Sequence, residues 1–188
     1  MAYGYAAQNV DPETTSKAAG REIPVKPKFG VNVARHIKGM GVEQAKQYLE
    51  DVIALKRSIP FKTHKRQVKH RRDISGPGQY PVAVCRAFLR VLKDAESNAE
   101  YKGLDPEKMY VWHAVAHKGA GMPGFMPRAQ GRATSWDKST SHIEIVLKER
   151  EAEGEEKATE KKAAATPADR KKAAAARKKA KAKAKKEE

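Results

Sequence analysis

The sequence has little cysteine, few aromatic residues and no long hydrophobic run. Cys85 is the only cysteine among 188 residues, which excludes an internal disulfide and a cysteine-rich zinc site. No apolar run approaches the roughly 20 residues that a membrane-spanning helix needs. The opening stretch MAYGYAAQNVDPETT has neither the basic nor the apolar region of a secretory signal. We therefore expect a protein of the reducing cytoplasm, with no membrane span.

Positive charge is what the sequence has in excess. It contains 39 Lys and Arg against 23 Asp and Glu, which gives a net charge of +16 and a pI near 9.9. Charged residues make up 33% of the chain, whereas aromatic residues make up only 6%. Such an excess of one sign predicts a polyanionic partner, and RNA or DNA is the commonest one.

Hydrophobicity divides the chain into three segments. Residues 151–188 contain 13 basic and 8 acidic residues, and alanine is their only apolar type. Such a segment cannot build a core, so we predict a charged, Lys/Ala-rich tail that is disordered or ordered by RNA. Residues 1–20 also lack a hydrophobic pattern and are predicted to form an N-terminal extension. The globular domain is then expected over residues 21–150.

Apolar spacing predicts one strand and three helices in the first part of this domain. Ile23, Val25 and Phe29 alternate with lysines, which indicates a strand, and two prolines between them place it at a sheet edge. Helical spacing follows over residues 33–40, 42–53 and from Pro81 to Gly103. Residues 56–80 between the last two helices carry no apolar period and are predicted to be a long loop.

Two further strands are predicted near residues 109–116 and 142–147, where apolar and polar residues alternate. We expect Val111 and Val115 of the first strand to lie in the core with Ile143, Ile145 and Leu147 of the second. The predicted fold is α+β, with three helices packed on a small three-stranded antiparallel sheet. The last two strands would extend into a long protruding β-hairpin over about residues 108–148.

A basic cluster lies in the long loop. Eight cations occur between residues 56 and 72, and no acid follows until Asp73. They are Lys56, Arg57, Lys62, Lys65, Arg66, Lys69, Arg71 and Arg72. Phosphate neutralisation with counterion release would remove their mutual repulsion, so we predict an RNA-binding loop. A solubilising loop and a nuclear-localisation signal are the alternatives.

The predicted hairpin is too poor in core residues to be stable alone, since a two-stranded ribbon is marginal in water. Another surface is expected to order it. Lys118, Arg128, Arg132 and Lys138 could contact phosphates. Met122, Phe125 and Met126 form an apolar group between Pro123 and Pro127. The alternative is a flexible surface loop.

The residues that could support catalysis are few. His113 and His117 share one face of a strand, but no third or fourth metal ligand is apparent. Cys85 lies on an apolar helix face, where a nucleophile is not expected. The sequence has no glycine-rich phosphate loop, nucleophile elbow or carboxylate pair at a catalytic spacing. We expect no enzymatic activity, no cofactor and no metal, and a metal- or thiol-dependent enzyme remains the competing hypothesis.

Several stretches resemble one family in order and spacing. They comprise residues 11–18, 37–40, 45–49, 52, 59–61, 92–99, 102–105, 127–133 and 142–147. Together they resemble the large-subunit ribosomal protein numbered twenty-two in the universal scheme (seventeen in eukaryotic naming), of the archaeal or eukaryotic type. The resemblance covers about residues 8–149, and the tail after Arg150 departs from it.

The resemblance implies a structural constituent of the large ribosomal subunit that binds 23S/28S-type ribosomal RNA and aids subunit assembly. It also implies neighbouring ribosomal proteins as partners, and a hairpin that lines the nascent-polypeptide exit tunnel. Arg128 and Arg132 would contact RNA, and the tunnel-lining tip would consist of Gly119, Ala120, Gly121, Met122, Pro123, Gly124, Phe125 and Met126. An architectural DNA-binding protein is the alternative, because basic tails and ribbon arms also bind DNA.

Overall fold

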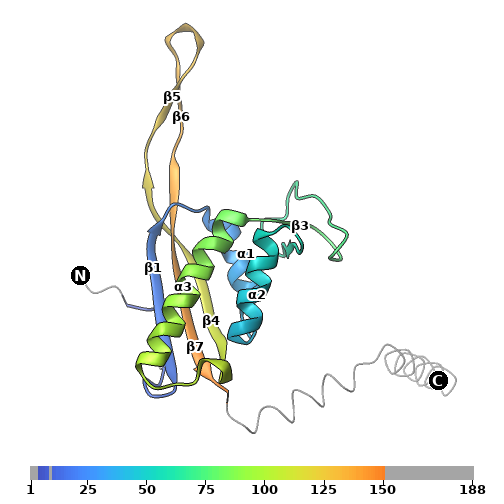
Figure 1. The fold of residues 1–188 in the computed structure, drawn as a ribbon. Coiled ribbons are helices and arrows are strands. Elements are labelled where there is room, and N and C mark those ends of the chain that lie inside the picture. The colour runs from blue at the N-terminus through green and yellow to red at the C-terminus, as the bar shows by residue number, and fades with distance from the viewer. Residues whose placement is uncertain (1–3, 9, 151–188) are drawn as a thin grey trace, which may run out of the picture. The chain divides into compact units, whose positions relative to one another are not determined.

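The computed structural model describes residues 4–8 and 10–150 and has three helices and a three-stranded antiparallel sheet (Figure 1). In chain order the elements are β1 (Thr15–Ile23), α1 (Pro27–Ile37), α2 (Val42–Ile53), β2 (Ile59–Pro60), β3 (Gly78–Gln79), α3 (Val82–Tyr101), η1 (Pro106–Lys108), β4 (Met109–Met122), β5 (Phe125–Pro127), η2 (Ala129–Gly131), β6 (Ala133–Ser135) and β7 (Lys138–Glu149). The predicted α+β class is confirmed. The predicted tail of residues 151–188 lies outside the described residues.

The main sheet has the strand order β1-β7-β4, so the last strand of the chain is the central one. β7 pairs with β1 from Thr15↔Lys148 to Ile23↔Ser141. On its other side it pairs with β4 from Met109↔Glu149 to Met122↔Lys138. Two smaller antiparallel pairs, β2 with β3 and β5 with β6, lie outside this sheet.

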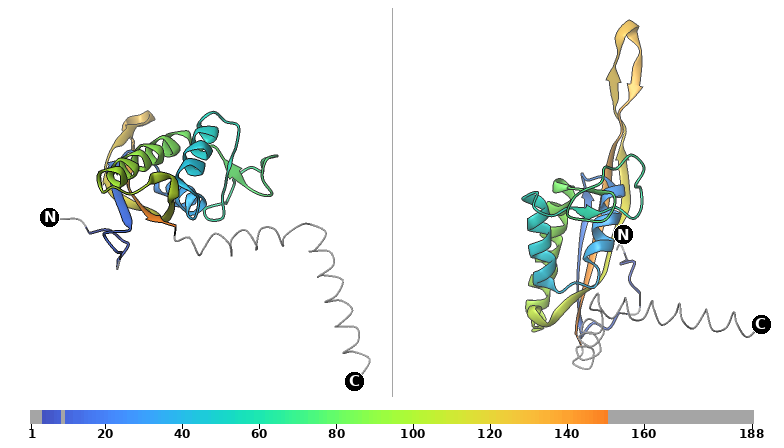
Figure 2. Two further views of the ribbon diagram at one scale, coloured as in Figure 1. Left: turned by 60° about the horizontal axis from the view of Figure 1, so that its bottom comes forward. Right: turned by 90° about the vertical axis from the view of Figure 1, so that its right-hand side faces the viewer.

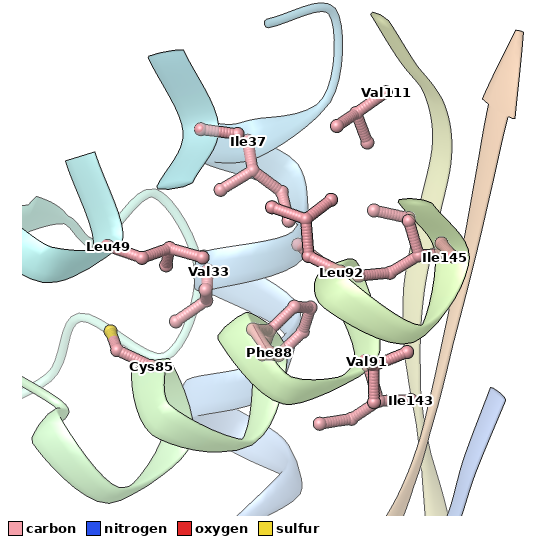
Figure 3. Packing of buried hydrophobic residues seen from close by; sticks show 14 of the residues in the cluster. Val33, Ile37, Leu49, Cys85, Phe88, Val91, Leu92, Val111, Ile143 and Ile145 are labelled. Carbon is pink, nitrogen blue, oxygen red and sulfur yellow. The ribbon is translucent and has the colours of Figure 1, made fainter. Parts of the chain in front are cut away.

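α2 and α3 lie on one side of the sheet in the right-hand view of Figure 2, and Gly30 of α1 lies close to both Phe88 of α3 and Ala116 of β4, so α1 shares this face. α1 and α3 contact the sheet, and α2 packs mainly on α3. The core between these layers contains Phe88 and Leu92 of α3 with Ile143 and Ile145 of β7, all fully buried (Figure 3). The predicted apolar stripes of residues 42–53 and of the third helix therefore face the core, as expected.

The strand predicted at residues 23–29 is wrong. Pro27 begins α1 instead, because a proline needs no backbone N–H donor in the first helical turn. Phe29 lies on that helix, and its ring meets the ring of Phe61 edge-on at a centroid distance of 5.6 Å. The edge strand that precedes the helices is β1, which starts at Thr15, inside the segment predicted as an extension, and β4 is the other edge.

β1 has no alternating hydrophobic pattern in the sequence, because small and polar residues occupy its buried positions. Thr15 and Ser16 are buried, as is Ala18. The hydroxyl of Ser16 donates a hydrogen bond of 2.5 Å to the carbonyl of Ala95 in α3. Pairing with β7 and this bond to α3 hold the strand in place without large apolar side chains.

A β-bulge in β4 changes which side chains of that strand face the core, compared with the predicted alternation. Val111 pairs with Leu147, but the next pair is His113↔Val146, so Trp112 is an extra residue. An extra residue reverses which side chains face the core beyond it. Ala114 and Ala116 are consequently buried against the helices. Val111 lies in the core as predicted, but Val115 pairs with Glu144 on the opposite face, so its prediction is wrong.

The opposite face of the sheet is partly covered by the N-terminal segment. Glu144 of β7 is 3% exposed on this face. Its carboxylate accepts a hydrogen bond of 2.8 Å from the Ala6 amide and forms an ion pair with Arg21 at 3.2 Å. Residues near the start of the described chain therefore form part of the folded domain.

Replacing Gly30 with alanine tests the inward direction of Ala116. In an exposed helix this change would stabilise the protein by about 1 kcal/mol. Here a Cβ atom at Gly30 would lie 2.8 Å from the Cβ of Ala116. We expect a net loss of about 1 kcal/mol in the free energy of unfolding, since a core gains strain when it is overpacked.

Chemical denaturation of Gly30→Ala, Ala116→Gly and the double variant measures this contact. The double-mutant cycle should give a coupling of about 1–2 kcal/mol in favour of the double variant. Gly30→Ala that is more stable than the unmodified chain, with no coupling, would contradict the described register.

Candidate nucleic-acid interface

The root of the basic loop is built into the fold. Ile59 and Phe61 are 0% and 2% exposed, although residues 56–80 were predicted to carry no apolar pattern. β2 and β3 pair through Ile59↔Gln79 and Pro60↔Gly78, which closes the loop at its base. Two apolar residues in a basic stretch are too few to form a period, so the sequence did not reveal this anchor.

Polar contacts fix the same root. The Tyr48 hydroxyl donates a hydrogen bond of 2.6 Å to the Ser58 carbonyl, and burial raises the pKa of Tyr48 to about 12. The backbone amide and hydroxyl of Ser58 both donate to the Asp73 carboxylate. The hydrogen bond from the Ser58 backbone amide contributes most to lowering the pKa of Asp73. Asp73, the acid that follows the cations, thus connects the end of the basic stretch to Ser58 at its beginning.

All eight predicted loop cations are exposed to solvent. They are Lys56, Arg57, Lys62, Lys65, Arg66, Lys69, Arg71 and Arg72. The side chains of Arg57 and Arg71 also make contacts within the domain. Arg57 lies 4.0 Å from Asp51 and over the Tyr48 ring, and Arg71 donates to the Gly78 carbonyl and lies over the Tyr80 ring. The loop therefore presents its charge outward from a fixed base.

A second basic surface lies on the two strands that leave the helices. Beyond Lys118↔Ser141 the β4–β7 ladder continues through Gly121↔Ser139 to Met122↔Lys138, and the separate β5–β6 pair follows it. Figure 1 shows these strands extending away from the helical layer. We call residues 118–138 the arm. Its predicted cations Lys118, Arg128, Arg132 and Lys138 are all exposed.

Glycine allows the two strands of the arm to approach closely. The Trp136 amide donates a hydrogen bond of 2.7 Å to the Gly124 carbonyl. A Cβ atom at Gly124 would lie 2.8 Å from the Trp136 carbonyl oxygen, so a side chain does not fit there. Gly124 thus serves a contact within the arm itself.

The chain reverses direction later in the arm than the tip prediction implied. Met126 pairs with Thr134 and Pro127 with Ala133, so the turn consists of residues 128–132. Gln130 and Gly131 both have positive φ, of 60° and 68°, as a tight reversal requires. Residues 119–126, predicted as the tip, instead comprise the end of β4, the link of Pro123 and Gly124, and the start of β5, all before this turn. The hydrophobicity of residues 119–126 does not indicate where the chain reverses, because the position of the turn depends on the backbone conformation of Gln130 and Gly131.

The arm also carries exposed apolar side chains. Met122, Phe125 and Trp136 are 58%, 76% and 54% exposed. Trp136 was not among the predicted site residues, although it lies two residues before Lys138. Exposed aromatic rings beside cations are suited to stacking on unpaired bases. A lone tryptophan in a polar, basic stretch was the feature that could have revealed it.

The residues of the competing enzyme hypothesis do not assemble into a site. Cys85 is fully buried, and burial raises the pKa of its thiol to about 12, which disfavours the thiolate. Burial, more than any neighbouring charge, lowers the pKa of His113. Within residues 4–8 and 10–150, no three His, Cys, Asp or Glu side chains are grouped to hold a metal. No helix of this part is long and apolar enough to span a membrane.

The anchored loop and the two-stranded arm both carry several exposed cations. This arrangement is typical of proteins that bind nucleic acid in a structural role. The family model of ribosomal protein L22p/L17e matches residues 18–148. Large ribosomal subunit protein uL22 of Methanocella arvoryzae is 49% identical over 148 residues, covering 78% of this chain and 96% of the relative. The uL22 protein of Methanopyrus kandleri is 44% identical over 151 residues, covering 79% and 95%. That of Methanoculleus marisnigri is 46% identical over 148 residues.

The chain belongs to the ribosomal protein L22p/L17e family. It is therefore a structural ribosomal protein of the archaeal type rather than an enzyme, as the resemblance implied. None of these comparisons favours the DNA-binding alternative.

Proposed function

We propose that this protein, as a structural constituent of the large ribosomal subunit in the cytoplasm, holds large-subunit ribosomal RNA through the basic loop and the arm. The observation that carries the proposal is the exposure of all twelve predicted cations of the two surfaces. The loop that carries eight of these cations has a buried root, so its base is fixed before RNA binds. Pre-set charges lose less conformational entropy on binding than charges on a flexible loop.

The mechanism is electrostatic and geometric. The loop and the arm extend from different parts of the domain, as Figure 1 shows, so their cations can neutralise phosphates of different RNA segments. Such contacts recognise RNA by its backbone and shape more than by its base sequence. By holding separate RNA segments in one arrangement, the protein would aid subunit assembly. Neighbouring ribosomal proteins are further partners.

The arm has the properties of a segment that functions within RNA. β5 and β6 have no buried residue, and only Met126 among them is half-buried. A ribbon of this kind is marginal alone and gains stability when another surface packs around it. We place the arm along the nascent-polypeptide exit tunnel, where Met122 and Phe125 would present apolar surface to the passing chain.

A photo-reactive benzoylphenylalanine at Phe125 tests the position of the arm. In translating ribosomes it should cross-link to large-subunit ribosomal RNA and to the nascent chain. The same replacement at Tyr101, which is 93% exposed at the end of α3, is the matched control and should not cross-link to the nascent chain. Cross-links from both positions, or from neither, would refute the tunnel assignment.

A further inference from the structure

A hollow between α1 and the start of the basic loop brings Arg35 and His36, which lie outside the predicted sites, together with the loop cation Lys62. It has a volume of about 150 Å³ and is lined by Asn32, Arg35, His36, Pro60 and Lys62. Arg35 and Lys62 are exposed, and His36 is half-buried. No acidic residue lines the hollow. It is polar, cationic and large enough for one phosphodiester group with water around it.

Asn32 fixes the walls of this hollow. It is 2% exposed, and its Oδ1 accepts hydrogen bonds from the Thr63 amide at 3.2 Å and the Thr63 hydroxyl at 3.1 Å. Its Nδ2 donates to the Lys28 carbonyl at 3.1 Å and the Thr63 carbonyl at 3.0 Å. The three bonds to Thr63 tie the loop to α1 immediately after Lys62, whereas the bond to Lys28 lies within α1. Asn32 is thus a positioning residue that keeps the Lys62 backbone beside the helix that carries Arg35.

His36 lies near Arg35, Arg57 and Lys62. Arg57 lies 4.0 Å from Asp51, but no acidic residue lines the hollow itself. Its ring lies against the Tyr48 ring of α2 at a centroid distance of 4.5 Å. Burial first, and then Arg57 and Lys62 of the loop, lower its pKa. Arg35 of α1 adds another cation to the same hollow. A bound anion would relieve this repulsion and favour the imidazolium, which can donate from both nitrogens.

We propose that this hollow binds one phosphate group of the ribosomal RNA backbone, with Arg35 and Lys62 pairing with its oxygens and His36 donating a hydrogen bond. The proposal rests on the proposed function and extends the RNA surface from the loop onto α1.

The surroundings of the hollow favour a polymer over a free ion. Arg35 also lines a neighbouring hollow of about 220 Å³, whose other cation is Lys38. Lys62, the other cation of the hollow, is followed along the chain by the exposed cations Lys65 and Arg66 of the basic loop. Cationic positions that succeed one another in this way match the repeating phosphates of a nucleic-acid strand.

Salt titration of RNA binding tests the proposal in the full chain. The probe is transcribed large-subunit ribosomal RNA, and the variant is Arg35→Gln with Lys62→Gln. Arg90→Gln with Lys93→Gln, which removes two exposed cations from α3, is the matched control for net charge. The hollow variant should lower the slope of log K against log salt by about 0.7–0.9 for each lost contact, and the control by less than half as much.

The titration midpoint of the His36 ring, followed by NMR, reports on the hollow directly. RNA should raise this midpoint in the unmodified chain and leave it unchanged in the Arg35→Gln, Lys62→Gln variant. Inorganic phosphate is the second probe. Concentrations of phosphate that raise the His36 midpoint should also weaken RNA binding, because both ligands would occupy the same hollow. A rise with inorganic phosphate that leaves RNA affinity unchanged would assign the hollow to a free ion and overturn the proposal.

Equal slopes for the two charge variants, with an unmoved His36 midpoint, would overturn the proposal and leave the proposed function intact. Failure of the unmodified chain to bind the RNA at all would overturn both.

Discussion

Replacing Lys65, Arg66, Lys69 and Arg72 with glutamine is expected to weaken binding to large-subunit ribosomal RNA by about 100-fold at moderate salt. All four side chains are exposed, and none forms an ion pair within the described residues. Their removal should therefore leave the fold unchanged. The slope of log K against log salt should fall by about 3, since each phosphate contact contributes roughly 0.7–0.9.

A charge-retaining variant separates charge from shape in this experiment. Arg66→Lys with Arg72→Lys keeps the loop charge but removes the planar guanidinium groups. We expect this control to keep the full slope, with at most a modest loss of affinity. An unchanged slope in the glutamine variant would show that the loop does not bind phosphates.

Replacing Phe88 with alanine is expected to lower the free energy of unfolding by about 3–5 kcal/mol. Phe88 is fully buried between the helices and the sheet, where the surrounding residues also pack on one another (Figure 3). The loss combines the transfer free energy of the ring with the cavity that it leaves. A loss of this size is a large fraction of the stability of a small domain.

Leu89→Ala is the matched control, because Leu89 is the next residue of α3 and is only partly buried. Denaturant titrations of both variants should show a clearly smaller loss for Leu89→Ala. Similar losses for the two variants would mean that α3 is rotated from the described orientation.

Long apolar stripes were the part of the fold that could be predicted from sequence. Val42, Tyr48 and Leu49 repeat at helical spacing, and α2 spans the predicted residues. β1 could not be found in this way, because Thr15, Ser16 and Ala18 are buried through pairing and a hydrogen bond to α3. The core face of β4 also depends on a bulge, which is a property of strand pairing.

The candidate interface also has parts that can be predicted from the sequence and parts that cannot. A run of cations without acids can be read from sequence, and all the cations singled out are exposed. The hollow at Arg35 could not be predicted, since Asn32 and Thr63 join segments that are far apart in the chain. Likewise, the turn at residues 128–132 depends on the backbone conformation of Gln130 and Gly131.

Sedimentation of this chain in a cell lysate tests the central claim most directly. If the protein is held by phosphate contacts over two surfaces, it should migrate with the large subunit in a sucrose gradient and remain there through moderate salt. Treatment with ribonuclease should release it. Migration as a free protein at low salt, or co-sedimentation with DNA in place of the large subunit, would contradict the account.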